Sequence, residues 1–392
     1  MPSSEPATPP DLNAGGLWQQ LRLPDVQSYG RLLRIVIYSL AALWMMLGLL
    51  AWTLYTGADV GTRAALVGLF AAFVPLPLYI SLILWIDRFE PEPHSALIAA
   101  FAWGAIVATA ISLVLNGIGG LILQGLLGGV GAPLTAPLVA PVVEELSKGA
   151  ALVGLYLWKR DEFNGVIDGI VYASIVGLGF AAVENILYYS RTLVDASGGG
   201  LPALFLLRGV LAPFAHPLFT SMFGIGIGLR LQSTNPNTRR FSPWIGLGAA
   251  IFLHSLWNSV AIADGRMFAL FYVIVWLPLF LGFLVVIALS LRREAEISGE
   301  LLRGELADGT LSASEHRELC TLSARLASEW QALRAGGIRG RRARRAFHRT
   351  ASELTLLRRR VACGHTTSND TQRERAWIDD LRATIEAIRA NR

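Results

Sequence analysis

Charged and imidazole side chains occur inside four consecutive apolar segments of this sequence. They are Glu144, Glu145, Lys148, Asp168, Glu184, Arg208, His216 and His254. An ionised side chain at the centre of a membrane helix costs roughly 2.5–3.5 kcal/mol, so such residues are expected to pair in a polar cavity. Glutamates and histidines held together could activate water for hydrolysis, relay protons or bind a metal. The sequence therefore predicts one shared, hydrated site.

The segment around Glu144 has an informative spacing. Glu144 and Lys148 are four residues apart and can pair on one helical face, whereas Glu145 lies about 100° around the helix. One glutamate could be a structural partner of the lysine while the other stays available for proton transfer. Prolines at 133, 137 and 141 remove backbone donors and predict a break or kink before Val142.

Two further segments carry groups that suit hydrolysis. His254 and Asn258 share a helical face, and His216 stands between two prolines that can distort the backbone. A glutamate that takes a proton from water, opposite His254 and Asn258 as donors to an oxyanion, would supply the parts for amide hydrolysis. Glu184, His216 and His254 could instead bind a divalent metal such as zinc. The sequence contains neither an H-E-x-x-H pair nor a G-x-S-x-G serine motif.

Non-catalytic roles for these residues also remain possible. Arg208 is expected to be a structural counter-ion, and Asp168 lies close enough to a span boundary to be a helix cap. The glutamates could be packing ion pairs, or they could line a transporter or proton relay. A non-catalytic membrane scaffold is the remaining alternative.

The composition determines which elements must position these residues. Of the 392 residues, 53% are hydrophobic and only 16% are charged, which indicates a polytopic, all-α membrane protein. About 20 apolar residues are needed to cross the bilayer core. The sequence predicts eight spans: 32–56, 64–86, 95–117, 133–157, 166–189, 203–230, 243–263 and 268–291. The glycine-rich run 118–132 is predicted to be re-entrant or interfacial.

Basic residues predict the orientation of the spans. Eight spans place alternate loops on the same side of the membrane, and the basic side faces the cytoplasm. One side has 11 basic residues: Arg22, Arg31, Arg34, Arg88, Lys159, Arg160, Arg230, Arg239, Arg240, Arg292 and Arg293. The other side has 3, which are Arg63, Arg191 and Arg266. Both termini are therefore predicted to be cytoplasmic, in a plasma-membrane protein.

The two ends of the chain differ from its apolar middle. Residues 1–30 are predicted to be a disordered tail and 31–292 the membrane domain; 293–392 form an arginine-rich, cytoplasmic helical region. Within that region, Ser312-x-x-Glu315 predicts a capping box for a helix to about Leu333. Gly336-Gly337 is expected to end it, with further helices near 341–361 and 369–390. Arginines at 339, 341, 342, 344 and 345 could contact anionic lipid headgroups or form a solvated charged face. Nucleic acid is not expected as a partner.

Four motifs together resemble the PrsW family of membrane proteases. These are Asp87-Arg88-Phe89-Glu90-Pro91-Glu92-Pro93, Glu144-Glu145-x-x-Lys148, Gly179-Phe180-x-x-x-Glu184-Asn185 and His254-x-x-x-Asn258, with a histidine at 216. The likeness covers about residues 30–290. The PrsW family belongs to the wider superfamily of CAAX prenyl proteases and bacteriocin-processing enzymes.

The resemblance implies a helical membrane core and proteolysis within or near the membrane, with bacterial members cutting an anti-sigma factor. By motif position, Glu144 and Glu145 match the paired glutamates, Glu184 the acidic residue of the second motif, and His216 and His254 the histidines. The CAAX proteases have a histidine where this chain has Glu184. Metal-dependent and glutamate-based hydrolysis therefore both remain open.

The resulting hypothesis is an endopeptidase acting on a membrane-anchored protein. Its catalytic residues are predicted to be Glu144, Glu145, Glu184, His254 and Asn258. The supporting residues are Lys148, Phe180 and Asn185, and the metal ligands, if a metal is used, are Glu184, His216 and His254.

Overall fold

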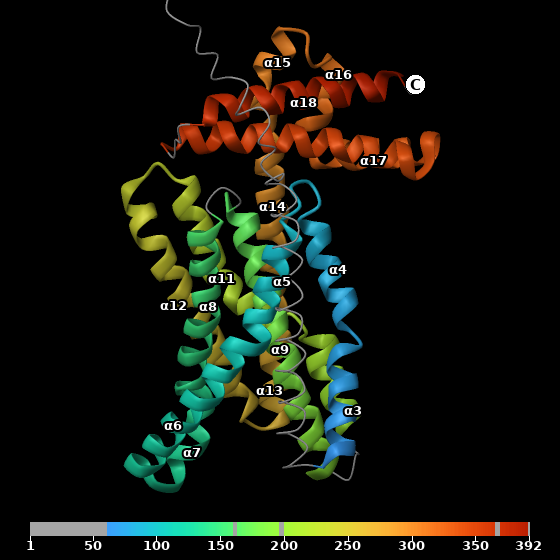
Figure 1. The fold of residues 1–392 in the computed structure, drawn as a ribbon. Coiled ribbons are helices and arrows are strands. Elements are labelled where there is room, and N and C mark those ends of the chain that lie inside the picture. Colours follow the sequence, from blue (N-terminus) through green and yellow to red (C-terminus); the bar gives the residue numbers. More distant parts are fainter. Residues whose placement is uncertain (1–60, 160–162, 196–199, 365–368, 391–392) are drawn as a thin grey trace, which may run out of the picture. The chain divides into compact units, whose positions relative to one another are not determined.

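A computed structural model describes residues 61–159, 163–195, 200–364 and 369–390. Every regular element among these residues is a helix, which confirms the all-α prediction (Figure 1). Six helical segments are long and apolar enough to cross a membrane: Thr62–Ile86, His94–Trp158, Val166–Asp195, Leu201–Gln232, Pro236–Ala261 and Gly265–Leu301. The predicted tail 1–30 and first span 32–56 lie outside the described residues.

The segment His94–Trp158 contains two of the predicted spans and turns back on itself. Its elements are α5 (His94–Ala102), a π-helix η1 (Trp103–Ala108), α6 (Thr109–Leu127), η2 (Gly128–Val130), α7 (Gly131–Leu138) and α8 (Ala140–Trp158). Gly128 has φ +66°, a conformation that favours glycine, and α6 packs against both α7 and α8. The run predicted to be re-entrant thus forms the end of α6 and the turn into α7.

The break predicted before Val142 is confirmed. Helix α7 ends at Leu138, and Val139, with φ −92° and ψ −52°, separates it from α8. Pro141 occupies the first turn of α8, where a missing backbone N–H costs no helical hydrogen bond. This short interruption determines where the Glu144 segment begins.

Helix α9 (Val166–Asp195) lies among the other membrane helices. It packs against α3 (Thr62–Phe73), α4 (Leu76–Ile86), α5, α8 and α11 (Ala215–Gln232). Its most apolar stretch is wholly buried by them. A Cβ added at Gly169 would lie 2.2 Å from the backbone oxygen of Gly224, so α9 and α11 approach closely because both residues are glycine. The chain therefore places Glu184 on its most enclosed helix.

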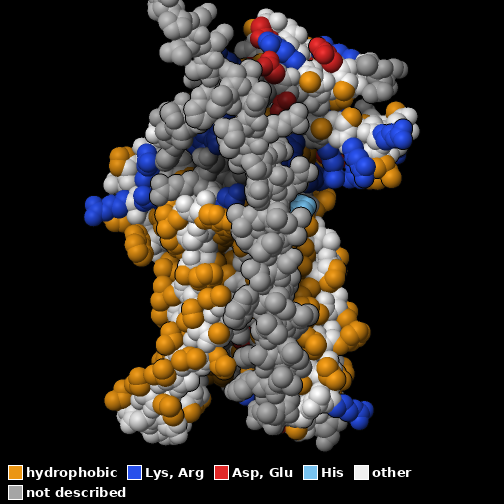
Figure 2. Space-filling view, in the orientation of Figure 1, with side chains coloured by type: hydrophobic (Ala, Val, Ile, Leu, Met, Phe, Trp, Pro, Cys, Tyr) orange, Lys and Arg blue, Asp and Glu red, His pale blue; other side chains and the backbone are white. Residues whose placement is uncertain are grey.

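The remaining membrane helices complete the wall around α9. They are α10 (Leu201–Phe205), the π-helix η3 (Leu206–Leu211), α12 (Pro236–Ala261), α13 (Gly265–Phe271), the π-helix η4 (Tyr272–Trp276) and α14 (Leu277–Leu301). Figure 2 shows hydrophobic side chains over much of the visible surface of the described membrane helices. Phe70, Leu121 and Trp244 are all more than 70% exposed, as expected for a surface that meets lipid.

The helical region that follows has its own apolar core. Its elements are α15 (Arg303–Ala307), α16 (Ala313–Leu319), α17 (Leu322–Ala362) and α18 (Asp370–Ala390). Leu302, Leu319, Phe347 and Leu381 are buried together between them. Helix α14 continues to Leu301 and so crosses the boundary that the sequence predicts at 292.

The capping box at Ser312 and Glu315 is confirmed, and the helix it starts is shorter than predicted. Helix α16 ends at Leu319, and a second helix begins at Leu322 after Thr321 caps it. Gly337, with φ +59° and ψ −150°, divides α17 at the predicted glycine pair. Ion pairs join the two arms of α17 on either side of Gly337 to each other, and one joins α17 to α16.

Three of the five clustered arginines take part in these ion pairs. Arg344 lies 2.7 Å from Glu318, and Arg345 and Arg341 lie 3.1 and 3.6 Å from Glu329. Arg339 and Arg342 are exposed. The paired side chains of Arg341 and Arg345 keep 43% of their surface exposed, so only Arg344 is largely covered.

Candidate active site

The structure brings the paired glutamates, Glu184 and both histidines together within the membrane helices. Glu144, Glu145 and Lys148 come from α8, Glu184 from α9, His216 from α11 and His254 from α12. All except Glu184 are buried, and 20% of the Glu184 side chain is exposed. The convergence expected from the sequence is thus present in the fold.

Lys148 is the central cation of the cluster. Its Nζ lies 2.6 Å from Glu145 Oε1 and 3.1 Å from His216 Nδ1, and 4.4 Å from the centre of the Phe180 ring. Two hydrogen bonds and one cation–π contact thus surround a side chain with no solvent exposure. Glu144 Oε2 is farther away, at 3.9 Å. The pairing of Lys148 with Glu144 that the sequence predicted is thus present, but the flexible lysine stem brings Nζ closer to Glu145.

Glu145 is held on both carboxylate oxygens. Oε1 contacts Lys148 and lies 2.9 Å from His254 Nδ1, and Oε2 accepts a hydrogen bond of 2.9 Å from the Thr220 hydroxyl. The side chain is only 1% exposed. Glu145 therefore orients its neighbours and has little capacity left for a substrate.

Glu144 has one carboxylate oxygen available. Oε1 accepts a hydrogen bond of 3.2 Å from Asn116 Nδ2, whereas Oε2 is buried and has no hydrogen-bond partner in the part of the chain that the structure describes. Oε2 faces His254 Nε2 at 3.7 Å. Of the two adjacent glutamates, Glu144 is thus the one that can hold a water molecule or a cation.

Glu184 is part of a second ion pair at the edge of the cluster. Its Oε2 forms a short ion pair with Arg208 and lies 3.0 Å from His216 Nε2. Arg208 Nε also donates to Asn185 Oδ1 at 2.6 Å. This geometry agrees with the predicted counter-ion role of Arg208, and it makes Glu184 and Asn185 supports for His216.

Each imidazole has a carboxylate on one ring nitrogen. His254 Nδ1 meets Glu145 and His216 Nε2 meets Glu184, so the N–H groups are assigned to these nitrogens from the hydrogen bonds. The opposite nitrogens carry the lone pairs and point into the cluster. Histidines that bind a metal usually donate their outer N–H in this way.

The residues present fit a divalent metal. Glu144, His216 and His254 each offer a ligand atom, and these three atoms lie within 4.8 Å of one another. One carboxylate and two imidazoles is a common donor set for zinc, and the unpartnered Glu144 Oε2 would gain a partner. Glu144 thus takes the place that the sequence analysis gave to Glu184. Lys148 would have to move off His216 Nδ1 for a metal to bind there.

Asn258 is not brought to the carboxylates. Its Nδ2 donates to the backbone oxygen of Ala136 at 2.8 Å, and Ser255 on the same helix donates to Pro137 O at 2.5 Å. These bonds fasten α12 to α7. Asp168 also has a local role, because its Oδ2 accepts the N–H groups of Asn164 and Gly165 at the start of α9. That arrangement is the helix cap left open by the sequence.

Two residues of the site, Asn116 and Thr220, were not predicted. Both are uncharged, so neither stood out in an apolar segment. Thr220 follows His216 by four residues and shares its helical face, a spacing that could have indicated it. Asn116 carried no such signal, because its contact to Glu144 is made across two helices.

Charge balance also distinguishes Glu144. The carboxylates Glu144, Glu145 and Glu184 outnumber the cations Lys148 and Arg208 by one when both histidines are neutral. Glu145 and Glu184 each have a close cation. The surplus negative charge therefore belongs to Glu144, the carboxylate with the available oxygen.

Comparison with known proteins agrees with this geometry. Residues 92–283 match the family model described as "PrsW family intramembrane metalloprotease". Protease PrsW of Geobacillus kaustophilus is 28% identical over 180 residues, which are 46% of this chain and 73% of that protein. Protease PrsW of Clostridioides difficile is 28% identical over 213 residues, or 51% of this chain and 84% of that protein.

A third relative matches a shorter stretch. Protease PrsW of Oceanobacillus iheyensis is 30% identical over 104 residues, which are 26% of this chain and 44% of that protein. No solved structure matches the chain significantly. The six residues of the cluster all lie inside the matched range; they are Glu144, Glu145, Lys148, Glu184, His216 and His254. The domain formed by residues 92–283 belongs to the PrsW family of intramembrane proteases.

Proposed function

We propose that this membrane peptidase hydrolyses a peptide bond of a membrane-anchored protein, with Glu144 as the carboxylate that binds the attacking water. The observation that carries this proposal is Glu144 Oε2, which is buried, has no hydrogen bond and faces His254 Nε2. A general base must have an oxygen within reach of the water it activates. Glu145 and Glu184 have their oxygens engaged by Lys148, Thr220, His216 and Arg208.

The chain's own residues supply the proton path. Glu144 Oε2 takes a proton from water as the water oxygen attacks the scissile carbonyl carbon, and later gives that proton to the departing amine nitrogen. Lys148 is the nearest cation to this oxygen and is positioned to stabilise negative charge on the carbonyl oxygen. Glu145 and Glu184 keep the two imidazoles oriented.

A metal would act at the same place. Zinc or a similar divalent ion held by Glu144, His216 and His254 would lower the pKa of bound water toward about 7 and polarise the carbonyl. The rings of Phe180 and Phe219 lie 5.2 Å from His216 and 5.0 Å from His254. These apolar walls restrict water at both imidazoles and strengthen electrostatic contacts there.

The position of the site suggests the class of substrate. Glu144, Glu184, His216 and His254 all belong to segments long and apolar enough to span a bilayer. A peptide bond that reaches them must enter the membrane layer, as in a single-pass protein. An anti-sigma-factor-like regulator in the plasma membrane is the narrower form of this proposal and follows from the family resemblance alone.

Cleavage of single-pass peptides by the full chain in lipid nanodiscs tests the proposal. We expect Glu144→Gln to lower the cleavage rate at least about 100-fold, because the amide cannot accept the proton. Glu300→Gln, an exposed position on α14, is the matched control and should cleave normally. A Glu144→Gln variant that cleaves at the wild-type rate would refute the proposal. Loss of cleavage with a chelator and its return with zinc would identify the metal-dependent form.

A further inference from the structure

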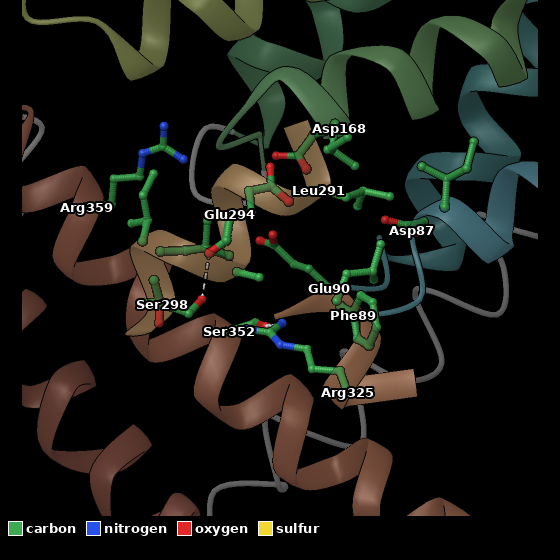
Figure 3. Close-up of a pocket in the computed structure, with 17 residues that line it drawn as sticks. Asp87, Phe89, Glu90, Asp168, Leu291, Glu294, Ser298, Arg325, Ser352 and Arg359 are labelled. Carbon is green, nitrogen blue, oxygen red and sulfur yellow. Dashed lines mark hydrogen bonds between the residues drawn. The ribbon is translucent and has the colours of Figure 1, made fainter. Parts of the chain in front are cut away.

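A second group of carboxylates lies outside the peptidase cluster. Asp87 and Glu90, from the segment between α4 and α5, Asp168 at the start of α9 and Glu294 on α14 line a cavity of about 30 Å³. Figure 3 shows these side chains around the same space, with Arg325 and Ser352 of α17 closing another side. None of them takes part in the chemistry proposed above.

Three of these carboxylates are fixed through one oxygen. Asp87 Oδ2 accepts the N–H of Glu92 at 2.8 Å, Asp168 Oδ2 accepts two backbone N–H groups, and Glu90 Oε1 accepts from Asn164 Nδ2 at 3.1 Å. The other oxygen of Asp87, Oδ1, is buried and meets no hydrogen-bond partner among the described residues, and Asp87 as a whole is 3% exposed. The backbone thus holds the acids in place and leaves acceptor capacity for something else.

Charge is not balanced in this cavity. Arg325 and Arg359 are the cations that line it, so four carboxylates face two guanidinium groups. Arg325 donates hydrogen bonds to Leu319 O and Ser352 Oγ. Within the described residues, Glu294 has neither a side-chain hydrogen bond nor an ion pair. When all four carboxylates are ionised, the cavity lining therefore has a formal charge of −2.

The pKa values of Asp87 and Glu90 agree with this excess of carboxylates over cations. Burial, reinforced by the negative charge of Asp168 and Glu294, raises the pKa of Asp87 to about 8. Burial and the same neighbours raise the pKa of Glu90 well above its usual range. These carboxyl groups thus lack a positive partner when ionised.

The chemistry of the lining selects the ligand. Carboxylate and hydroxyl oxygens without sulfur or imidazole are the donors that Mg²⁺ and Ca²⁺ prefer. The volume holds an ion with a water or two. No three of these carboxylates, among the described residues, bring ligand atoms within 4.8 Å of one another. That spacing leaves at most two of them for direct contact, and Mg²⁺ is commonly bound through one or two carboxylates with water among its other ligands.

We propose that this cavity binds one partly hydrated Mg²⁺ ion, which contacts one or two of the carboxylates Asp87, Glu90, Asp168 and Glu294 directly and the others through water. The ion would neutralise the surplus charge and join the start of α9 to α14 and to the 87–90 segment. It is separate from the peptidase cluster, and the proposal stands whether or not that cluster uses a metal.

Binding of Mn²⁺, a paramagnetic substitute for Mg²⁺, tests the proposal in the full chain. The protein is placed in phosphatidylcholine nanodiscs, which lack anionic headgroups, and carries His216→Ala and His254→Ala to remove the peptidase ligands. We expect one Mn²⁺ per chain by electron paramagnetic resonance, displaced by Mg²⁺. Adding Asp87→Asn and Glu294→Gln should weaken binding at least about 10-fold, because two anionic ligands are lost. Glu300→Gln should leave it unchanged.

Thermal unfolding provides a control for folding. The Asp87→Asn/Glu294→Gln chain should unfold at or above the wild-type temperature in the absence of cations, because its neutral amides remove repulsion. Mg²⁺ should raise the unfolding temperature of the wild type and not of this variant. Equal Mn²⁺ binding in the two chains, or an equal response to Mg²⁺, would overturn the proposal. A wild type that responds to pH but not to Mg²⁺ would show that protons alone neutralise the cavity. A larger response to Ca²⁺ than to Mg²⁺ would overturn the choice of ion.

Discussion

At the scale of single residues, Asn116 bears directly on the chemistry of Glu144. Among the residues that the structure describes, its amide is the only donor to Glu144 Oε1, and it determines how the other oxygen, Oε2, is oriented. Asn258, the amide that the sequence indicated, bonds to Ala136 O instead. Replacing Asn116 should therefore affect catalysis, whereas replacing Asn258 should affect it less.

We expect Asn116→Ala to lower kcat more than Asn258→Ala does. A hydrogen bond to a charged group is worth about 1.5–3 kcal/mol, so kcat should fall about 10- to 100-fold while KM changes less. Steady-state cleavage of a single-pass peptide measures both constants. The reverse ranking would return Asn258 to the oxyanion role.

Asp87 should make the stability of the chain depend on pH. In the folded chain burial raises its pKa to about 8, from an ordinary value of 3.8. Between these values the folded state binds more protons than the unfolded state, so stability is lost as pH rises toward 8. Asp87→Asn cannot ionise and should flatten this loss. Unfolding temperatures from pH 5 to 9, with divalent ions chelated, test the prediction, and an unchanged slope would contradict it.

At the scale of elements, the approach of α9 to α11 positions His216. A Cβ at Gly177 would lie 2.7 Å from the backbone nitrogen of Pro217 and 2.8 Å from the carbonyl carbon of His216. Backbone atoms cannot move aside as a flexible side chain can. Gly177 is therefore required for the contact between His216 and Glu184.

We expect Gly177→Ala to destabilise the membrane domain by about 1–3 kcal/mol and to lower cleavage, because the two helices must separate. Gly154→Ala on α8 is the matched control, since nothing lies within 4 Å of its added Cβ. That change should be neutral or slightly stabilising in a helix. Thermal unfolding and peptide cleavage of both variants decide the matter, and equal behaviour would contradict the packing argument.

The elements also show why prediction from sequence succeeded and where it ended. Long apolar runs predicted the membrane helices, and the proline at 141 predicted the break at Val139. Both features depend only on the residues of the segment itself. The convergence of Glu144, Glu184 and His254 followed from the cost of isolated charges in lipid. The sequence did not predict that Glu145 is the closest partner of Lys148. The position of this flexible side chain depends on how the helices pack.

At the scale of the whole molecule, the distribution of basic residues predicts the orientation. Eleven Arg and Lys residues lie on one side of the predicted spans and three on the other, so the region after α14 should be cytoplasmic. A green fluorescent protein fused after Arg392 should fluoresce, and alkaline phosphatase fused there should be inactive. An active phosphatase would place the C-terminus outside and reverse the topology.

The pairing of Glu184 with Arg208 has a consequence for how the chain enters the bilayer. Glu145 and Lys148 neutralise each other within α8, so two of the three charged side chains of that helix are already matched when it is inserted. Glu184 on α9 instead depends on an arginine that emerges 24 residues later from the ribosome. Without Arg208, helix α9 would carry an unpaired glutamate into the lipid. Its release from the translocon should therefore await synthesis of the segment that contains Arg208.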